Sequence, residues 1–159
     1  MSLKEQLRAS LSGLAPFAQG SQALDVTDGN QQLRVEIVSL DRLACAFDRI
    51  TLSADALKWA KVERLRQVAE KLSASLTYLL EPISPIEIDA HGCTVQMRSN
   101  PPQKESDRTT YYELLVQDTG ELSLCRYTRT VGGSRERTAA EVTREVLLRL
   151  AGDMSAVAS

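Results

Sequence analysis

The segment between Ser53 and Pro82 constrains the possible folds of this chain more than any other part of the sequence. Its apolar residues recur at intervals of three or four, at Trp59, Val62, Leu65, Ala69, Leu72, Leu76 and Leu79. Since an α-helix has 3.6 residues per turn, this spacing gathers the apolar side chains on one face. Pro82 lacks an amide proton and cannot continue a helix. The pattern predicts one amphipathic helix of about 27 residues, roughly 40 Å long.

The N-terminal residues predict a short helix followed by a connector. Ser2 and Glu5 have the spacing of a capping box, in which each side chain binds a backbone amide of the first turn. Four leucines then share one helical face until Pro16 interrupts the pattern, namely Leu3, Leu7, Leu11 and Leu14. Residues 20–32 are rich in Gly, Asp, Asn, Ser and Gln, which favour turns. We therefore expect a helix and a mobile connector over residues 1–32.

Alternating apolar residues predict about six strands. They are expected over residues 33–37, 43–52, 86–88, 93–97 and 112–116 and from residue 122 onwards. His91-Gly92 and Asp118-Thr119-Gly120 supply the turns of two hairpins. Residues 99–108 contain two prolines and no large apolar side chain, so we expect a loose loop there.

The C-terminal residues predict a final helix. Thr138 and Glu141 have the spacing of a second capping box. The apolar residues that follow recur at helical intervals, at Val142, Val146, Leu147 and Leu150. Gly152 is expected to end this helix. Residues 152–159 are then expected to be a flexible tail.

Together these elements predict a single α+β domain over residues 1–159. Strands that follow one another through short turns form an antiparallel sheet, here of about six strands, with one long and two shorter helices packed on one face. The order of elements resembles that of the type III secretion chaperones and of several ligand-binding helix-and-sheet domains. The likeness lies in architecture alone, because the chain contains no sequence motif of either group.

Composition places the chain among ordinary globular proteins. Of its 159 residues, 43% are hydrophobic and 25% are charged, and the formal net charge is -2. Such a balanced charge does not suit a surface that attracts nucleic acid or anionic lipid, so neither a nucleic-acid nor a membrane partner is expected. No stretch is apolar enough to span a bilayer, and the N-terminus lacks the apolar core of a signal peptide. We expect a cytoplasmic protein.

The residue types that usually carry chemistry are sparse. Three cysteines, an odd number, are widely spaced at Cys45, Cys93 and Cys125, which favours neither a disulfide framework nor a zinc site. His91 lies two residues from Cys93, but no third group that would orient a nucleophile can be named. The sequence therefore predicts no cofactor, no metal and no catalytic residue.

Residues 126–137 form a strongly basic segment. Glu136 is the only acid among its four arginines, which are Arg126, Arg129, Arg135 and Arg137. They flank a Gly-Gly loop just before the expected final helix, where guanidinium groups and free amides favour an anion. A solvated basic loop explains the same pattern. Binding of an anion or a nucleic acid through this segment therefore stays an alternative.

Two surfaces are candidates for association with a partner. The long helix is expected to extend beyond strands of roughly 23 to 30 Å, so its apolar end needs a cover from the first helix or from another subunit. The residues at that end are Leu76, Leu79 and Leu80. The sheet face turned away from the helices is expected to carry Tyr111, Leu115 and Tyr127, and tyrosines suit an interface.

These observations favour a noncatalytic binding or adaptor protein that acts through protein–protein association, most simply as a homodimer. A small-ligand carrier is the main alternative. Its pocket would lie between the sheet and the long helix, lined by Trp59, Met97 and Phe47.

Overall fold

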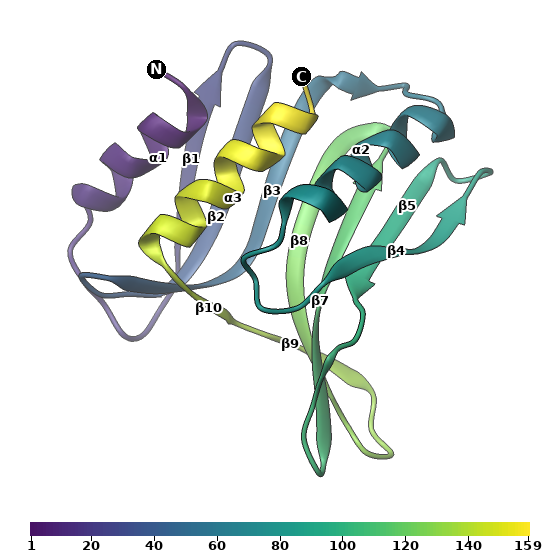
Figure 1. Ribbon diagram of the computed structural model, residues 1–159. Coiled ribbons are helices and arrows are strands. Elements are labelled where there is room, and N and C mark those ends of the chain that lie inside the picture. The colour runs from purple at the N-terminus through teal and green to yellow at the C-terminus, as the bar shows by residue number, and fades with distance from the viewer.

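A ten-stranded antiparallel sheet and three helices make up residues 1–159 in the computed structural model (Figure 1). In chain order the elements are α1 (Leu3–Ser12), β1 (Gln22–Asp28), β2 (Gln31–Leu40), β3 (Ala44–Lys58), α2 (Val62–Ser75), β4 (Ile83–Asp89), β5 (Thr94–Ser99), β6 (Gln103–Lys104), β7 (Arg108–Gln117), β8 (Thr119–Thr130), β9 (Arg135–Thr138), β10 (Ala140–Thr143) and α3 (Arg144–Val157). The main strand order is β1-β2-β3-β8-β7-β5-β4. Three short strands lie off this path: β6 pairs with β7, β9 with β8 and β10 with β3.

The predicted α+β class with an antiparallel sheet is confirmed. The expected number of strands, about six from the alternation of apolar residues, is too low.

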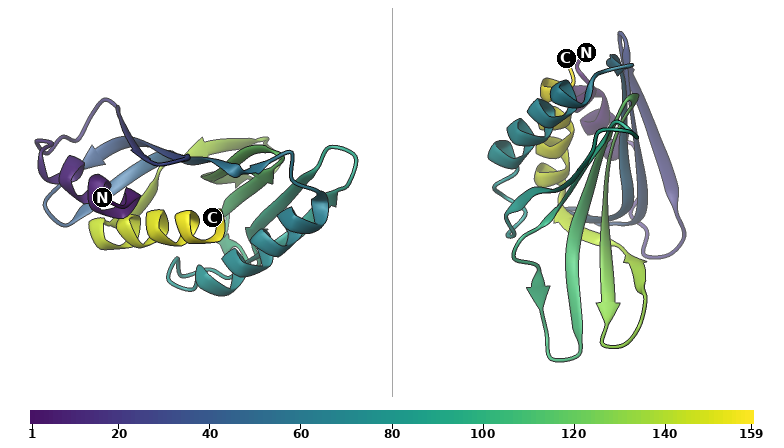
Figure 2. Two further views of the ribbon diagram at one scale, coloured as in Figure 1. Left: turned by 90° about the horizontal axis from the view of Figure 1, so that it is seen from above. Right: turned by 90° about the vertical axis from the view of Figure 1, so that its right-hand side faces the viewer.

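The helices lie on one side of the sheet (Figure 2). There α1 contacts β1 and α3, α2 contacts β4, β5 and β7, and α3 contacts β3 and β10. Strand residues on this side are buried at alternate positions, as at Leu33, Val35 and Ile37 of β2. They join the buried faces of the helices in a single core cluster of 36 residues. None of the three helices is both long enough and apolar enough to cross a bilayer.

The predicted long helix is wrong, because its first residues belong to a strand. β3 continues to Lys58, and α2 begins only at Val62 and ends at Ser75. Trp59 lies between them with a φ of 62° and a side chain that is 88% exposed. α2 and α3 therefore have 14 residues each and α1 has 10, so no helix extends beyond the sheet as expected.

Pairing with two neighbouring strands explains why β3 is so long. Ala54 lies opposite Gln31 of β2, and Lys58 lies opposite Thr119 of β8. Ala54 and Leu57 are buried in the core. Two ladders of backbone hydrogen bonds and the burial of apolar side chains thus outweigh the helical spacing that begins at Trp59.

A strand occupies much of the segment expected to be a mobile connector. β1 pairs along its whole length with β2, from Gln22 opposite Ile37 to Asp28 opposite Gln31. Gly29, at a φ of 58°, occupies the turn between them. The polar side chains that resemble a linker line the outer face of this strand, where Asp25 forms an ion pair with Arg34 at 2.9 Å.

The C-terminal residues also differ from the prediction. Thr138 and Glu141 do not begin a helix, because they lie in β9 and β10, and the Thr143 hydroxyl instead accepts the Val146 N–H at 3.1 Å. Gly152 lies inside α3, against the side chain of Lys4. The final residues are not a flexible tail, since their apolar members Met154, Val157 and Ala158 are buried.

Two local predictions are confirmed. Ser2 and Glu5 form the expected capping box at the start of α1, whose leucines Leu3, Leu7 and Leu11 are buried. Asp118 and Gly120 lie in the tight β7–β8 hairpin, and Gly120 has a φ of 94°, a conformation that disfavours other residues.

Candidate functional site

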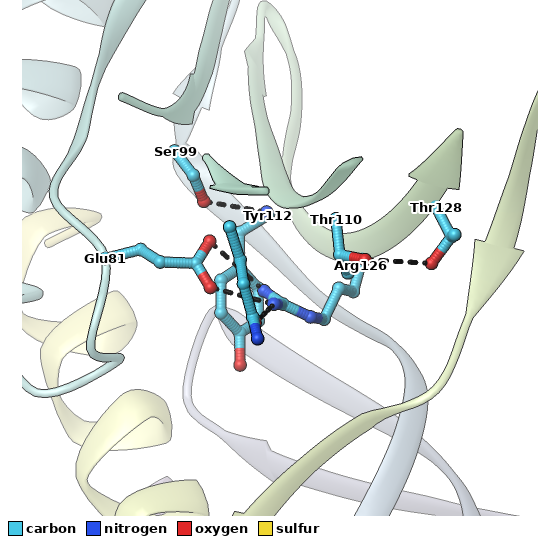
Figure 3. A network of polar contacts seen from close by, with 7 residues as sticks. Glu81, Ser99, Thr110, Tyr112, Arg126 and Thr128 are labelled. Atoms are coloured by element: carbon cyan, nitrogen blue, oxygen red, sulfur yellow. Dashed lines mark hydrogen bonds and ion pairs between the residues drawn. The ribbon is translucent and has the colours of Figure 1, made fainter. Parts of the chain in front are cut away.

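A groove of about 700 Å³ lies on the core side of the long β7–β8 hairpin. Its floor includes Thr110 and Tyr112 of β7 and Arg126 and Thr128 of β8, which pair across the two strands. Its walls come from residues 79–82 and 101–105 and from residues 138–141. We call this feature the Arg126 groove (Figure 3).

An ion pair between Arg126 and Glu81 forms the centre of the groove. Arg126 Nη2 donates to Glu81 Oε2 at 2.8 Å, and Nη1 donates to Oε1 at 3.3 Å. Only 11% of the arginine side chain and 10% of the glutamate side chain are exposed. Nη2 also donates to Gln103 Oε1 at 3.1 Å. Two-pronged pairs of this kind fix geometry strongly, so Glu81 is anchored although it lies in a connection.

Tyr112 and its neighbours complete the floor. The Arg126 guanidinium carbon lies 4.4 Å from the centre of the Tyr112 ring, a cation–π contact. Burial raises the pKa of the Tyr112 phenol, although the Arg126 charge opposes this and the Glu81 carboxylate adds to it. The Ser99 hydroxyl accepts the Tyr112 N–H at 2.8 Å, as Figure 3 shows. The floor is therefore a rigid polar surface.

Leu80 lies at the edge of this groove and is almost fully exposed, at 96%. Its φ is 67°, which is unfavourable for a bulky side chain. The residues on either side are fixed, because Leu79 is buried in the core and Glu81 is held by Arg126. The fold thus holds an apolar side chain in water in a strained backbone conformation.

The four arginines of the basic segment do not converge on one site. Arg126 faces the core side of the sheet, whereas Arg129, Arg135 and Arg137 lie on the opposite face. Arg135 forms an ion pair with Glu113, and Arg137 forms one with Asp48 at 3.0 Å. Residues 126–137 form the β8–β9 hairpin.

The predicted neighbouring helix start is therefore wrong. β10 separates the basic segment from α3, which begins at Arg144. Arg129 donates through Nε to the Gly133 carbonyl at 3.3 Å, so the Gly-Gly loop is held by this arginine instead of presenting free amides with it.

The interface residues predicted at the end of the long helix have separate locations. Leu76 and Leu79 are part of the core, with 1% and 5% exposure, and offer no surface to a partner in this fold. Leu80 is exposed as described. The prediction that Leu76 and Leu79 contact a partner is therefore wrong, because no helix end extends beyond the sheet.

The tyrosine-bearing face lies where the sequence places it. Tyr111 and Tyr127 pair across β7 and β8 on the face opposite Tyr112, with ring centres 6.0 Å apart. Arg98 lies 4.6 Å over the first ring and Arg135 lies 4.0 Å over the second. Leu115 is half-buried on the same face. The aromatic surfaces are thus covered by guanidinium groups.

The small-ligand pocket predicted from three large side chains does not form. Phe47 and Met97 are completely buried in the core, while Trp59 lies in a turn and is exposed to water. They do not share a cavity because the long helix that would have brought Trp59 over the sheet is absent. Cys45, Cys93 and Cys125 are free, and no group of three or more His, Cys, Asp or Glu side chains has the arrangement of a metal site.

Sequence reasoning did not identify Glu81 or Tyr112 as parts of a site. Their contacts join residues far apart in the chain, since Glu81 and Arg126 are 45 positions apart. The only local signal was a carboxylate next to Pro82 after an apolar run.

Comparisons with protein-family models, with curated proteins and with solved structures find no match to this chain. What defines the protein is its architecture, that of an α+β antiparallel-sheet protein whose β7–β8 hairpin carries the Arg126 groove.

Proposed function

We propose that this chain is a noncatalytic binding protein that acts through protein–protein association, and that its partner is a second copy of the same chain. The observation that carries the proposal is the position of Leu80. A bulky residue in the left-handed region costs about 1 to 2 kcal/mol, and its exposure to water adds no compensating stability to the single chain. A partner that buries Leu80 offsets this cost.

The surroundings of Leu80 suit a second copy. An interface with twofold symmetry needs a projection and a recess on the same surface patch, so that each subunit fills the other. Leu80 lies beside the Arg126 groove, whose walls include Pro82, Pro101 and Pro102. Two symmetry-related copies can thus exchange their leucines.

The charges in the groove are compatible with self-association. It contains two arginines, Arg108 and Arg126, and three glutamates, Glu81, Glu105 and Glu141. Two of the glutamates form ion pairs with these arginines, at 2.8 Å for Glu81 and 2.9 Å for Glu105. Copies of a nearly neutral patch do not repel one another.

The ion pairs of Glu81 and Glu105 also favour binding over acid–base chemistry, since they occupy carboxylates that would otherwise transfer protons.

Sedimentation equilibrium of the intact chain from low micromolar to millimolar concentration tests the proposal. The wild-type chain is expected to form a dimer, and Leu80→Gly is expected to raise its dissociation constant at least about tenfold, as loss of a central anchor does. The same variant is expected to keep or increase the free energy of unfolding of the monomer, because glycine accepts the positive φ.

Val131→Ser is the matched control. Val131 is 84% exposed in the β8–β9 turn, away from the groove. This variant is expected to dimerise like the wild type. A chain that stays monomeric at every concentration, or a Leu80→Gly variant with unchanged association, would overturn the proposal.

A further inference from the structure

A second pocket, of about 430 Å³, adjoins the Arg126 groove at Pro102 and opens on the other face of the sheet, where Arg98 and Arg129 lie. It is lined by Ile86, Arg98, Ser99, Asn100, Pro102, Thr109, Tyr111 and Arg129. Two of these residues are cations and none is an acid. In a chain with a net charge of -2, such a concentration of positive charge does not follow from overall composition.

Neither arginine of this pocket has a carboxylate partner. The acid closest in register to Arg98 is Glu113, directly opposite on β7, and its carboxylate pairs with Arg135 instead. Arg98 is held by the Tyr111 ring, and its Nε is buried without a hydrogen-bond acceptor. Arg129 uses Nε for the Gly133 carbonyl, so its two terminal nitrogens stay available. A buried N–H without an acceptor is costly, so the Arg98 Nε calls for a partner.

Neighbouring residues add to the positive charge. Thr109 lies opposite Lys104 of β6 on one side and opposite Arg129 of β8 on the other, and Arg129 lies opposite Arg135 of β9. Residues directly opposite one another in an antiparallel sheet point to the same face. Lys104 and Arg129 thus add two cations at the border of the pocket, while Glu113 balances the charge of Arg135.

We propose that this pocket binds the phosphate group of a phosphate monoester. Two guanidinium groups match the two charges of a phosphate and offer it forked N–H donors. The Thr109 hydroxyl and the Asn100 amide are further donors among the lining residues. Ile86 and Pro102 give the pocket an apolar side suited to the carbon-bearing part of an ester, and Ile86 is 45% exposed. The arginines of this site lie on the other face of the sheet from the proposed dimer contact, and Pro102 is the one lining residue that the two sites share.

Titration calorimetry of the intact chain with inorganic phosphate and with phenyl phosphate tests this site. Both ligands are expected to bind, with the ester binding more tightly because its ring reaches the apolar side. Arg129→Gln is expected to weaken binding at least about tenfold, as loss of one charge-assisted contact does. Arg129 is exposed at the end of β8, so this variant is expected to fold normally.

Arg98→Gln is the second variant, with the same expected loss of affinity, and its thermal unfolding is measured in parallel because Arg98 also packs on Tyr111. Arg34→Gln is the matched control, since Arg34 lies on the same sheet but is paired with Asp25. The proposal would be overturned if the wild type bound neither inorganic phosphate nor phenyl phosphate, or if it bound acetate as tightly as phosphate. It would also be overturned if Arg129→Gln bound phosphate as tightly as the wild type. Dimerisation is unaffected by these variants if both proposals hold, so the two proposals fail separately.

Discussion

The Arg126 guanidinium and the Glu81 carboxylate meet in a two-pronged ion pair that ties the connection after α2 to the long β7–β8 hairpin. Both side chains are about nine-tenths buried. The pair fixes the residue after Leu80, and it closes one end of the groove that Leu80 borders. Its strength therefore determines how rigidly the exposed leucine is held.

Loss of one partner of this pair is expected to destabilise the chain. Glu81→Ala leaves the Arg126 charge nearly buried, which is expected to lower the free energy of unfolding by about 3 kcal/mol. Urea denaturation measures the change. Glu63→Ala is the matched control, because Glu63 pairs with Arg66 at the surface of α2 and such pairs contribute less than about 1 kcal/mol. Equal effects of the two variants would contradict the importance of the buried pair.

Tyr78 is expected to make the stability of the chain depend on alkaline pH. Its hydroxyl donates to Asp153 Oδ2 at 2.6 Å and joins the connection after α2 to α3. Burial, followed by this bond and the Asp153 charge, raises the pKa of Tyr78. A raised pKa in the folded state means that the unfolded chain loses the proton first, near pH 10. Stability from this group is therefore complete below about pH 10 and falls as the pH rises further.

Tyr78→Phe measures that contribution. The variant is expected to lose about 1.5 to 3 kcal/mol at neutral pH, the range for a hydrogen bond to a charged group. Its unfolding free energy is expected to fall less steeply above pH 10 than that of the wild type. Urea denaturation at a series of pH values gives both quantities, and parallel pH profiles would show that Tyr78 is not the responsible group.

How far the sequence predicts this fold depends on how local each signal is. The capping box of Ser2 and Glu5 and the turn at Asp118–Gly120 involve neighbours in the chain, and both form as predicted. The alternation at residues 33–37 likewise identifies a strand because each residue faces either core or water.

The incorrect predictions depend on partners that are distant in sequence. Residues 53–58 fit the start of a helix and the end of a strand equally well, and only pairing with β2 and β8 decides between them. The same holds for β1, whose polar residues resemble a linker until Arg34 provides a partner for Asp25. Arg126 was identified by charge alone, whereas Glu81 became part of the site only through folding.

The three cysteines are expected to differ sharply in reactivity. Burial raises the pKa of the Cys45 thiol to about 11, and the thiolate is the reactive form. Cys125 is also buried, while Cys93 is only half-buried beside the β4–β5 turn. Labelling with iodoacetamide at pH 8, followed by mass spectrometry of peptides, is expected to modify Cys93 first. Labelling of the other two is expected to require urea, and early modification of Cys45 would contradict its buried position.

Trp59 provides the most direct test of the break between β3 and α2. It is the only tryptophan, so its fluorescence reports on this position alone. In a continuous helix it would pack against the sheet, and its emission would shift to longer wavelength on unfolding. Since its side chain is 88% exposed, we expect the emission maximum of the native chain to lie close to that of the unfolded chain.

The backbone at Trp59 gives a second, independent test of the break between β3 and α2. Its φ of 62° is unfavourable for a bulky residue and is accepted by glycine. Trp59→Gly is therefore expected to keep or raise the free energy of unfolding, by up to about 1 kcal/mol. A tryptophan packed on a helix would instead lose about 3 to 5 kcal/mol on truncation. A turn at Trp59 predicts an unchanged or higher free energy of unfolding for this variant, whereas a continuous helix predicts a lower one. Urea denaturation of the variant beside the wild type therefore decides whether the chain turns at Trp59.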